Sequence, residues 1–185
     1  HHAERRSFGG FCYFNNAAIA AEYLSTRGRV AVLDVDVHHG NGTQALLYNR
    51  SDVLFVSIHA SPDNLFPYFS GRAEEMGAGQ GAGYTVNYPL DRGTDDRAFD
   101  SALRQALNRV TQFQPEYLVL SLGYDTHRDD PIGIFSLTTA YFAQMAGRIA
   151  ALGIPTVIVQ EGGYNTATLG DNARTFVEGF LSGVE

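Results

Sequence analysis

Apolar residues along the chain fall into two patterns. In the first, apolar and small residues follow one another with at most one charged residue among them, as expected for strands that are buried on both faces of a sheet. Runs of this kind, together with one shorter and more polar segment, lie at residues 30–35, 53–58, 84–88, 117–122 and 156–159. We predict a strand at each of these five places.

In the second pattern, apolar residues recur at helical spacing. The clearest case is residues 95–113, with Phe99, Leu103, Leu107 and Val110. This spacing indicates an amphipathic helix with one face against a core. Further helices are predicted at residues 16–27, 42–49, 138–152 and 168–181, and a long loop at 60–83. Because strands and helices alternate, we predict an α/β fold with three layers, a largely parallel sheet between helices.

Composition narrows the function classes. The 185 residues contain no internal repeat or linker-like stretch, which predicts one domain over residues 1–185. A net charge of −7 argues against nucleic-acid binding and favours a cationic ligand. The single cysteine, Cys12, excludes an internal disulfide. No apolar stretch has the length of a transmembrane helix and no targeting pattern is present, so we expect a cytoplasmic location without membrane contact.

Polar side chains of the kind that bind metals follow four of the predicted strands. They are Asp34, Asp36, His38 and His39 after the first strand, Ser57 and His59 after the second, Asp125 after 117–122, and Glu161 and Tyr164 after 156–159. In open parallel sheets, the carboxyl ends of the strands lie at one edge, where ligands bind. We therefore expect these side chains to form an active site.

The sequence Asp-Val-His at residues 36–38 has the spacing of a metal site. Alternate residues of an extended segment point the same way, so Asp36 and His38 can reach one ion. Asp125 arrives from another strand end and is the natural third ligand. A nitrogen and two carboxylate oxygens suit zinc with one position open for water. The alternative, that His38 and His39 are ordinary loop histidines, is weaker because of the nearby Asp36 and Asp125.

Four long motifs resemble those of the zinc-dependent deacetylases, the family of histone deacetylases and bacterial acetylpolyamine amidohydrolases. They are HHAERRSFGGFCYFNNAA, LDVDVHHGNGTQ, GYDTHRDDPIG and EGGYN, and they occur in the family's order over nearly the whole chain. The resemblance implies the arginase/deacetylase fold, a parallel sheet of about eight strands between helices. It also implies that the segment preceding His1 in the family is missing, so that the chain is the C-terminal part of the catalytic domain.

The resemblance assigns a role to each matching position. The zinc ligands would be Asp36, His38 and Asp125, and the tandem catalytic histidines His1 and His2. Tyr164 would hydrogen-bond the substrate carbonyl, and Asp34 would orient His1. Gly10, Phe11 and Phe66 would line the acyl-chain tunnel. A structural potassium ion would be bound by Asp34, Ser57 and the carbonyl of Ile58.

One position departs from the pattern of some relatives. Asn41 stands where they have an aspartate behind the second histidine. A neutral amide stabilises an imidazolium less than a carboxylate does, so we expect His2 to stay neutral and to act as the general base. The alternative is that Asn41 is simply a loop residue that tolerates unusual backbone angles.

The sequence leaves the substrate open. The resemblance and the acidic charge favour a small cationic acylated amine, above all an acetylpolyamine, but the same tunnel would fit acetyl-lysine on a protein. A ureohydrolase with two metal ions is disfavoured because His127 stands where a further bridging aspartate is expected. A non-catalytic fragment that binds acyl-lysine is a third possibility. The resemblance also implies that a homodimer can form.

Overall fold

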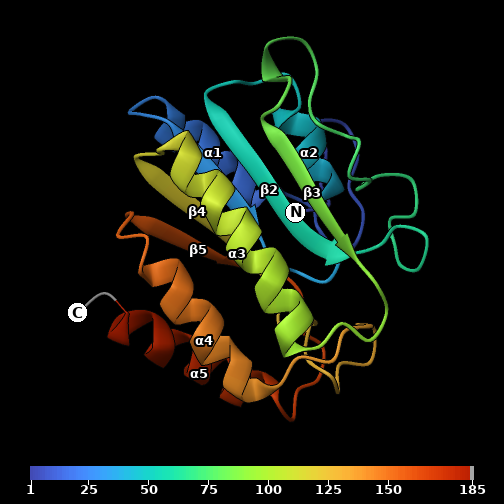
Figure 1. The fold of residues 1–185 in the computed structure, drawn as a ribbon. Coiled ribbons are helices and arrows are strands. Elements are labelled where there is room, and N and C mark those ends of the chain that lie inside the picture. Colours follow the sequence, from blue (N-terminus) through green and yellow to red (C-terminus); the bar gives the residue numbers. More distant parts are fainter. Residues whose placement is uncertain (184–185) are drawn as a thin grey trace.

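Five parallel strands form the central sheet in the order β3-β2-β1-β4-β5 (Figure 1). The computed structural model describes residues 1–183. The strands are β1 (Val30–Asp34), β2 (Val53–Ala60), β3 (Thr85–Leu90), β4 (Tyr117–Leu122) and β5 (Thr156–Gln160). The first, β1, lies at the centre, and all five of its residues are buried. The predicted parallel sheet is confirmed, and so is the α/β class.

Helices cover both faces of the sheet. They are α1 (Asn16–Ser25), α2 (Asn41–Leu47), α3 (Asp96–Phe113), α4 (Thr139–Ala150) and α5 (Leu169–Ser182). Figure 1 shows α3, α4 and α5 on the near side of the sheet and α1 and α2 on the far side. Two apolar clusters, one on each face, correspond to this division. The predicted three-layer arrangement is therefore present.

The longest helix illustrates how local sequence sets an element. The side chain of Asp95 accepts a hydrogen bond from the Ala98 N–H and caps the start of α3. The four apolar residues that predicted this helix are all buried against the sheet. The helix ends where Gln114 adopts a left-handed conformation, with φ of 52°. None of the helices in residues 1–183 combines the length and apolarity needed to cross a membrane.

The differences from the predicted elements are local, and they include shifts of about two residues at the ends of the first helix and the third strand. The second strand continues to Ala60, the predicted helix at 42–49 already ends at Leu47, and the long loop contains a short 3₁₀ turn at Gly79–Gly81. The described residues form five strands, fewer than the eight or so that the resemblance implies, because the chain has only five strand-like segments. The edge strand β5 leaves Val157 and Ile158 exposed by 42% and 41%.

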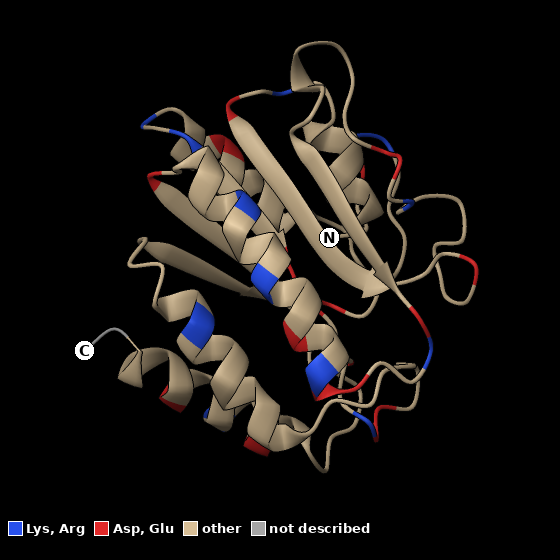
Figure 2. Ribbon diagram, viewed as in Figure 1, with Lys and Arg blue, Asp and Glu red and all other residues tan. Residues whose placement is uncertain are grey.

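Charged residues lie on the outer sides of the helices and in the loops, and the strands are almost free of them (Figure 2). Strand register then decides where the few buried polar groups meet. Asp34 at the end of β1 is paired with Ser57 on one side and Ser121 on the other. The carboxyl ends of three adjacent strands therefore lie level with one another, which brings the segments that follow them together.

Candidate active site

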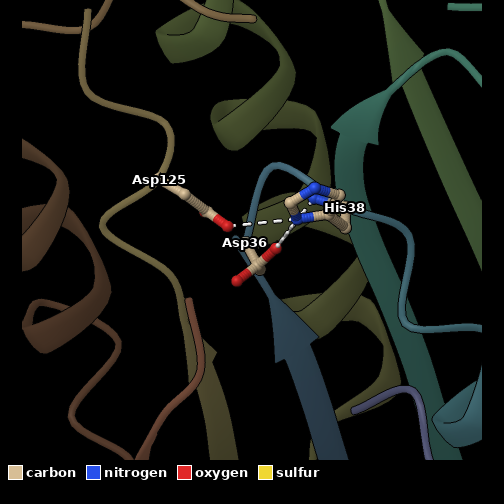
Figure 3. A group of neighbouring side chains, drawn as sticks. All are labelled: Asp36, His38 and Asp125. Atoms are coloured by element: carbon tan, nitrogen blue, oxygen red, sulfur yellow. Dashed lines mark hydrogen bonds and ion pairs between the residues drawn. The ribbon is translucent and has the colours of Figure 1, made fainter. Parts of the chain in front are cut away.

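Asp36, His38 and Asp125 meet in a buried cluster beyond the ends of β1 and β4 (Figure 3). Potential ligand atoms of the three residues all lie within 4.8 Å of one another. His38 Nδ1 lies 3.0 Å from Asp36 Oδ1 and 3.1 Å from Asp125 Oδ2. The two aspartates come from neighbouring strands, as the parallel order requires, although they are far apart in the sequence.

Electrostatics favour a cation at this cluster. Burial by itself would lower the pKa of His38, but its hydrogen bonds to Asp125 and Asp36 outweigh burial and raise it to about 10. Burial raises the pKa of Asp125 to about 7, and the negative charge of Asp36 adds to the rise. Two buried carboxylates thus share one imidazole, and a divalent cation would compensate their charge. One nitrogen and two carboxylate oxygens, close together and buried, fit zinc.

Backbone groups hold the two carboxylates in place. Asp36 Oδ2 accepts a hydrogen bond of 2.8 Å from the Gly162 N–H, and Asp125 Oδ1 accepts one of 3.1 Å from the Val37 N–H. Each bond occupies one oxygen and leaves the other directed at His38. Such outer contacts orient metal ligands and tune their basicity.

Two glycines let the backbone approach these carboxylates, and the sequence did not reveal their role. A Cβ at Gly162 would lie 2.1 Å from Asp125 Oδ2, and one at Gly123 would lie 2.3 Å from Asp36 Oδ2. Both distances are far below van der Waals contact. The available signal was the position of these glycines in GYDTHRDDPIG and EGGYN, beside residues expected at the site.

His1 and His2 lie beside the cluster in two different environments. His1 Nδ1 is 2.8 Å from Asp34 Oδ2, and His2 Nδ1 is 2.7 Å from Asn41 Oδ1. The two rings are buried, with centroids 4.1 Å apart. Asp34 is therefore placed to orient His1, and Asn41 lies directly behind His2.

The protonation of the two histidines differs because of these partners. Burial acts to lower the pKa of His1, but the charges of Asp34 and Asp36 raise it well above its ordinary value. Burial, followed by the charge of His1, lowers the pKa of His2 to about 3, although the bond to Asn41 opposes this change. The two shifts have opposite directions, so they favour the protonated form of His1 and the neutral form of His2.

Tyr164 borders the same cavity as His1 and His2. Burial, followed by the charge of Asp125, raises the pKa of its hydroxyl above its ordinary value, so the phenol stays protonated. The side chain is 39% exposed, and its ring centroid lies 6.1 Å from that of Phe11. Its backbone N–H donates to Asp130 Oδ2 at 2.7 Å.

An apolar cavity of about 640 Å³ opens above these residues. Among the groups that line it are Gly10, Phe11, Phe66, His2 and Tyr164. Phe66 packs edge-on against His2, with ring centroids 5.0 Å apart. Phe11 borders the cavity, but 83% of its surface is exposed, so it is a rim residue more than a buried wall.

A smaller cavity of about 350 Å³ adjoins the metal cluster and is bordered by His1, Asp36 and Glu161. Glu161 Oε1 accepts a hydrogen bond of 3.1 Å from the Ser121 hydroxyl. Glu161 was expected among the polar groups at the sheet edge, but the sequence did not indicate its particular partner.

The residues predicted to bind potassium are also close together. Asp34 and Ser57 are paired in register, with Ile58 next along β2. Ser57 Oγ is hydrogen-bonded to His59 Nδ1 at 2.8 Å, and Asp34 Oδ1 accepts a hydrogen bond from the Asp36 N–H at 3.2 Å. These contacts show that the three residues are neighbours but do not test whether they bind an ion. The potassium ion therefore stays a prediction.

His39 and His59 lie outside the metal cluster, although both stand among the polar side chains expected at this edge of the sheet. His39 Nε2 contacts Gln44 Oε1 at 3.0 Å, and His59 Nε2 donates to the Gly71 carbonyl at 2.8 Å. Burial lowers the pKa of both imidazoles to about 3. They are neutral groups that attach the long loop after β2 to the sheet.

Comparison with known proteins adds independent findings. The histone deacetylase domain matches residues 1–180. The chain is 51% identical over 181 residues to the acetylpolyamine amidohydrolase of Burkholderia pseudomallei (strain 1710b) and 48% identical over 181 residues to that of Mycoplana ramosa. Each alignment covers 97% of this chain and 53% of the relative. Histone deacetylase 6 of Caenorhabditis elegans is 37% identical, over 96% of this chain and 20% of that protein.

Solved structures show the same fold. The crystal structure of acetylpolyamine aminohydrolase from Burkholderia pseudomallei superposes with a TM-score of 0.95 at 51% identity, over 97% of this chain and 53% of that one. An HDAC homologue complexed with SAHA superposes with a TM-score of 0.91 at 36% identity, over 100% of this chain and 50% of that one. The chain thus spans about half the length of the acetylpolyamine relatives it matches.

Proposed function

The chain belongs to the histone deacetylase family, and from this premise we propose that it hydrolyses the amide bond of acylated amines, most readily of acetylpolyamines. One observation carries the proposal. A buried Asp–His–Asp cluster that fits zinc lies beside two histidines with different partners, Asp34 and Asn41, and beside an apolar cavity that Tyr164 borders. These are the groups that metal-assisted amide hydrolysis requires.

Asp36, His38 and Asp125 would hold the zinc ion. When bound there, zinc supplies a Lewis acid that polarises the amide carbonyl and lowers the pKa of water. The protein itself must then accept one proton, deliver another to the leaving amine and stabilise the developing oxyanion.

His2 is the general base in this proposal. Because Asn41 Nδ2 donates to Glu4 Oε1, at 3.2 Å, its Oδ1 is the atom that faces His2 and accepts a hydrogen bond from His2 Nδ1–H. The tautomer that remains has its lone pair on His2 Nε2, away from Asn41. With a pKa of about 3, this nitrogen is free to accept a proton from water at neutral pH.

His1 and Tyr164 complete the proton and charge balance. The imidazole of His1, held by Asp34, is the group that, when protonated, can donate a proton to the nitrogen of the leaving amine. Tyr164 keeps its hydroxyl proton and can donate a hydrogen bond to the oxyanion as it forms. No covalent acyl-enzyme is needed.

The apolar cavity suits a straight alkyl chain and the net charge of −7 suits a cationic substrate, and both properties fit a polyamine as well as a lysine side chain. The similarity to relatives is what favours the polyamine. The acetylpolyamine amidohydrolases share more identity with this chain than histone deacetylase 6 does, 51% and 48% against 37%. Acetyl-lysine on a protein is the alternative substrate. The potassium ion, the homodimer and the cytoplasmic location stay predictions.

The proposal is tested with the purified, zinc-loaded chain on N-acetylputrescine and on an acetyl-lysine peptide. We expect turnover of N-acetylputrescine, reduced by roughly 10²-fold or more in Tyr164→Phe and in His2→Ala. Tyr23→Phe, at an exposed position on α1, is the matched control and should retain full activity.

Each outcome has a definite meaning. Preference for the peptide would move the assignment to the protein-directed branch. Zinc binding with native folding but no turnover would overturn the proposal for this chain and favour a non-catalytic fragment. Release of urea from a guanidino substrate would indicate the ureohydrolase alternative.

A further inference from the structure

We propose that Asp130 is a positioning residue, which fixes the backbone of Tyr164 relative to the loop that carries Asp125. This inference rests on the proposed function, because Tyr164, the residue that Asp130 would fix, acts as the oxyanion donor in that function. Asp130 is not a catalytic residue in this view, since it would act only through its contacts to the backbone.

The contacts of Asp130 join two loops. Its Oδ2 accepts a hydrogen bond of 2.7 Å from the Tyr164 N–H, in the loop after β5. Its Oδ1 accepts bonds of 3.0 Å and 3.1 Å from the N–H groups of Ile132 and Gly133, in the loop after β4. The residue is only 8% exposed, so these bonds to a carboxylate are poorly screened by water.

The bond to Asp130 is the one made by the backbone N–H of Tyr164 itself, whereas the neighbouring bonds are made by Gly162 and Asn165. Tyr164 follows Gly162 and Gly163, and Gly163 has φ of 140°, a conformation outside the usual range for other residues. Its side chain is partly exposed, and the nearest aromatic ring described, that of Phe11, belongs to a rim residue. A donor on a glycine-rich loop is held in place by its backbone contacts more than by packing.

The other end of the same carboxylate reaches the metal-ligand loop. Gly133 approaches the Asp125 carbonyl so closely that a Cβ there would lie 1.9 Å from the oxygen. By binding the N–H of Gly133, Asp130 also sets the position of this contact. One side chain therefore sets the spacing between the oxyanion donor and a zinc ligand, where errors of about 1 Å cost up to roughly 10²-fold in rate.

The competing explanation is that Asp130 only stabilises the loops in general. Asp130→Asn separates the two, because asparagine keeps the shape but presents N–H donors at one of its two positions. We expect kcat for N-acetylputrescine to fall by roughly 10- to 100-fold with little change in KM. In a Tyr164→Phe background, the same change should lower kcat by less than about 3-fold, because the donor is already absent.

A second measurement does not depend on turnover. Hydrogen exchange of the Tyr164 amide should be slow in the parent and accelerate by at least about 10-fold in Asp130→Ala, because this change leaves the Tyr164 N–H without its side-chain acceptor. The matched control is Asp129→Asn, which removes the same charge from an exposed side chain of the same loop. This control should leave both the exchange rate and kcat unchanged, and zinc content is measured for every variant.

The outcomes distinguish this inference from the proposed function. An equal loss of kcat in both backgrounds, or an unchanged exchange rate at Tyr164, would overturn the role of Asp130. A parent that binds zinc but does not turn over would overturn the proposed function, and the exchange experiment would still decide whether Asp130 holds Tyr164.

Discussion

Replacing Asn41 with aspartate tests what keeps the imidazole of His2 neutral. The side chain of Asn41 contacts His2 Nδ1 at 2.7 Å, and both residues are buried. Aspartate has nearly the same shape and adds one negative charge at this position. The predicted effect is a rise in the pKa of His2.

The size of the rise follows from the geometry. Two unit charges about 4 Å apart interact by about 4 kcal/mol at an effective dielectric constant of about 20, equivalent to about 3 pH units. Two effects reduce this rise in the pKa of His2. The new carboxylate is buried, and it repels Glu4, which in the parent accepts a hydrogen bond from Asn41. We expect a net rise of about 2 units, from a parent pKa of about 3.

The assay is the pH titration of the histidine ring signals by NMR. The chain has six histidines, and a His2→Gln sample assigns the signal of His2. Asn49→Asp, at an exposed position just beyond the end of α2, is the matched control for the added charge. Its His2 signal should titrate as in the parent.

The sign of the kinetic effect follows directly. A base with a raised pKa is protonated at higher pH, so the acid limb of kcat/KM should move up with the NMR value. A shift of the NMR pKa by less than about 0.5 unit would refute the electrostatic reasoning. A full NMR shift without movement of the kinetic limb would refute the assignment of His2 as the base.

Three further predictions concern other parts of the site. Gly10→Ala should lower the free energy of unfolding by about 1–3 kcal/mol in denaturant titrations. The reason is that a Cβ there would lie 2.1 Å from the His2 ring and that Gly10 has φ of 52°. A loss below about 0.5 kcal/mol would contradict this close approach. His59 has a folded pKa of about 3 against 6.5 when unfolded, so the unfolded state binds the extra proton and stability falls as pH decreases from 6.5 toward 3. His59→Gln should therefore reduce the slope of unfolding free energy against pH by about 1.4 kcal/mol per pH unit near pH 5, and an unchanged slope would mean that His59 is protonated in the folded state. Asp125→Asn should weaken zinc binding in a chelator competition by more than the roughly 10- to 100-fold typical of an outer contact, whereas Asp129→Asn should not.

The strands and helices of this protein could be predicted because their determinants are local. Short, mostly apolar runs such as 30–35 and 117–122 favour buried strands, and the spacing within 95–113 favours a helix with one buried face. Parallel order followed from the alternation of the two kinds of element, and it placed the strand ends at one edge. Exposure at β5 was not predictable, because it depends on what lies beside the strand and not on its own residues.

For the site, local spacing was informative about Asp36 and His38, which are two positions apart, and uninformative about distances across the sheet. The contact between His38 and Asp125 arises because β4 is the neighbour of β1, a pairing between segments far apart in the sequence. The opposite protonation of His1 and His2 could be suspected from Asn41. Its extent depends on burial and on the charges of Asp34 and Asp36, which no linear pattern contains.

The hydrogen bonds of Asp130 and the close approaches at Gly123 and Gly162 were likewise not predictable from the sequence. Each is a contact between loops that follow different strands. Residue types and their order therefore indicate the elements and the chemistry of this protein. The packing of loops beyond the sheet edge determines which groups meet, at what distance and in which charge state, because those depend on strand order and on the exclusion of water.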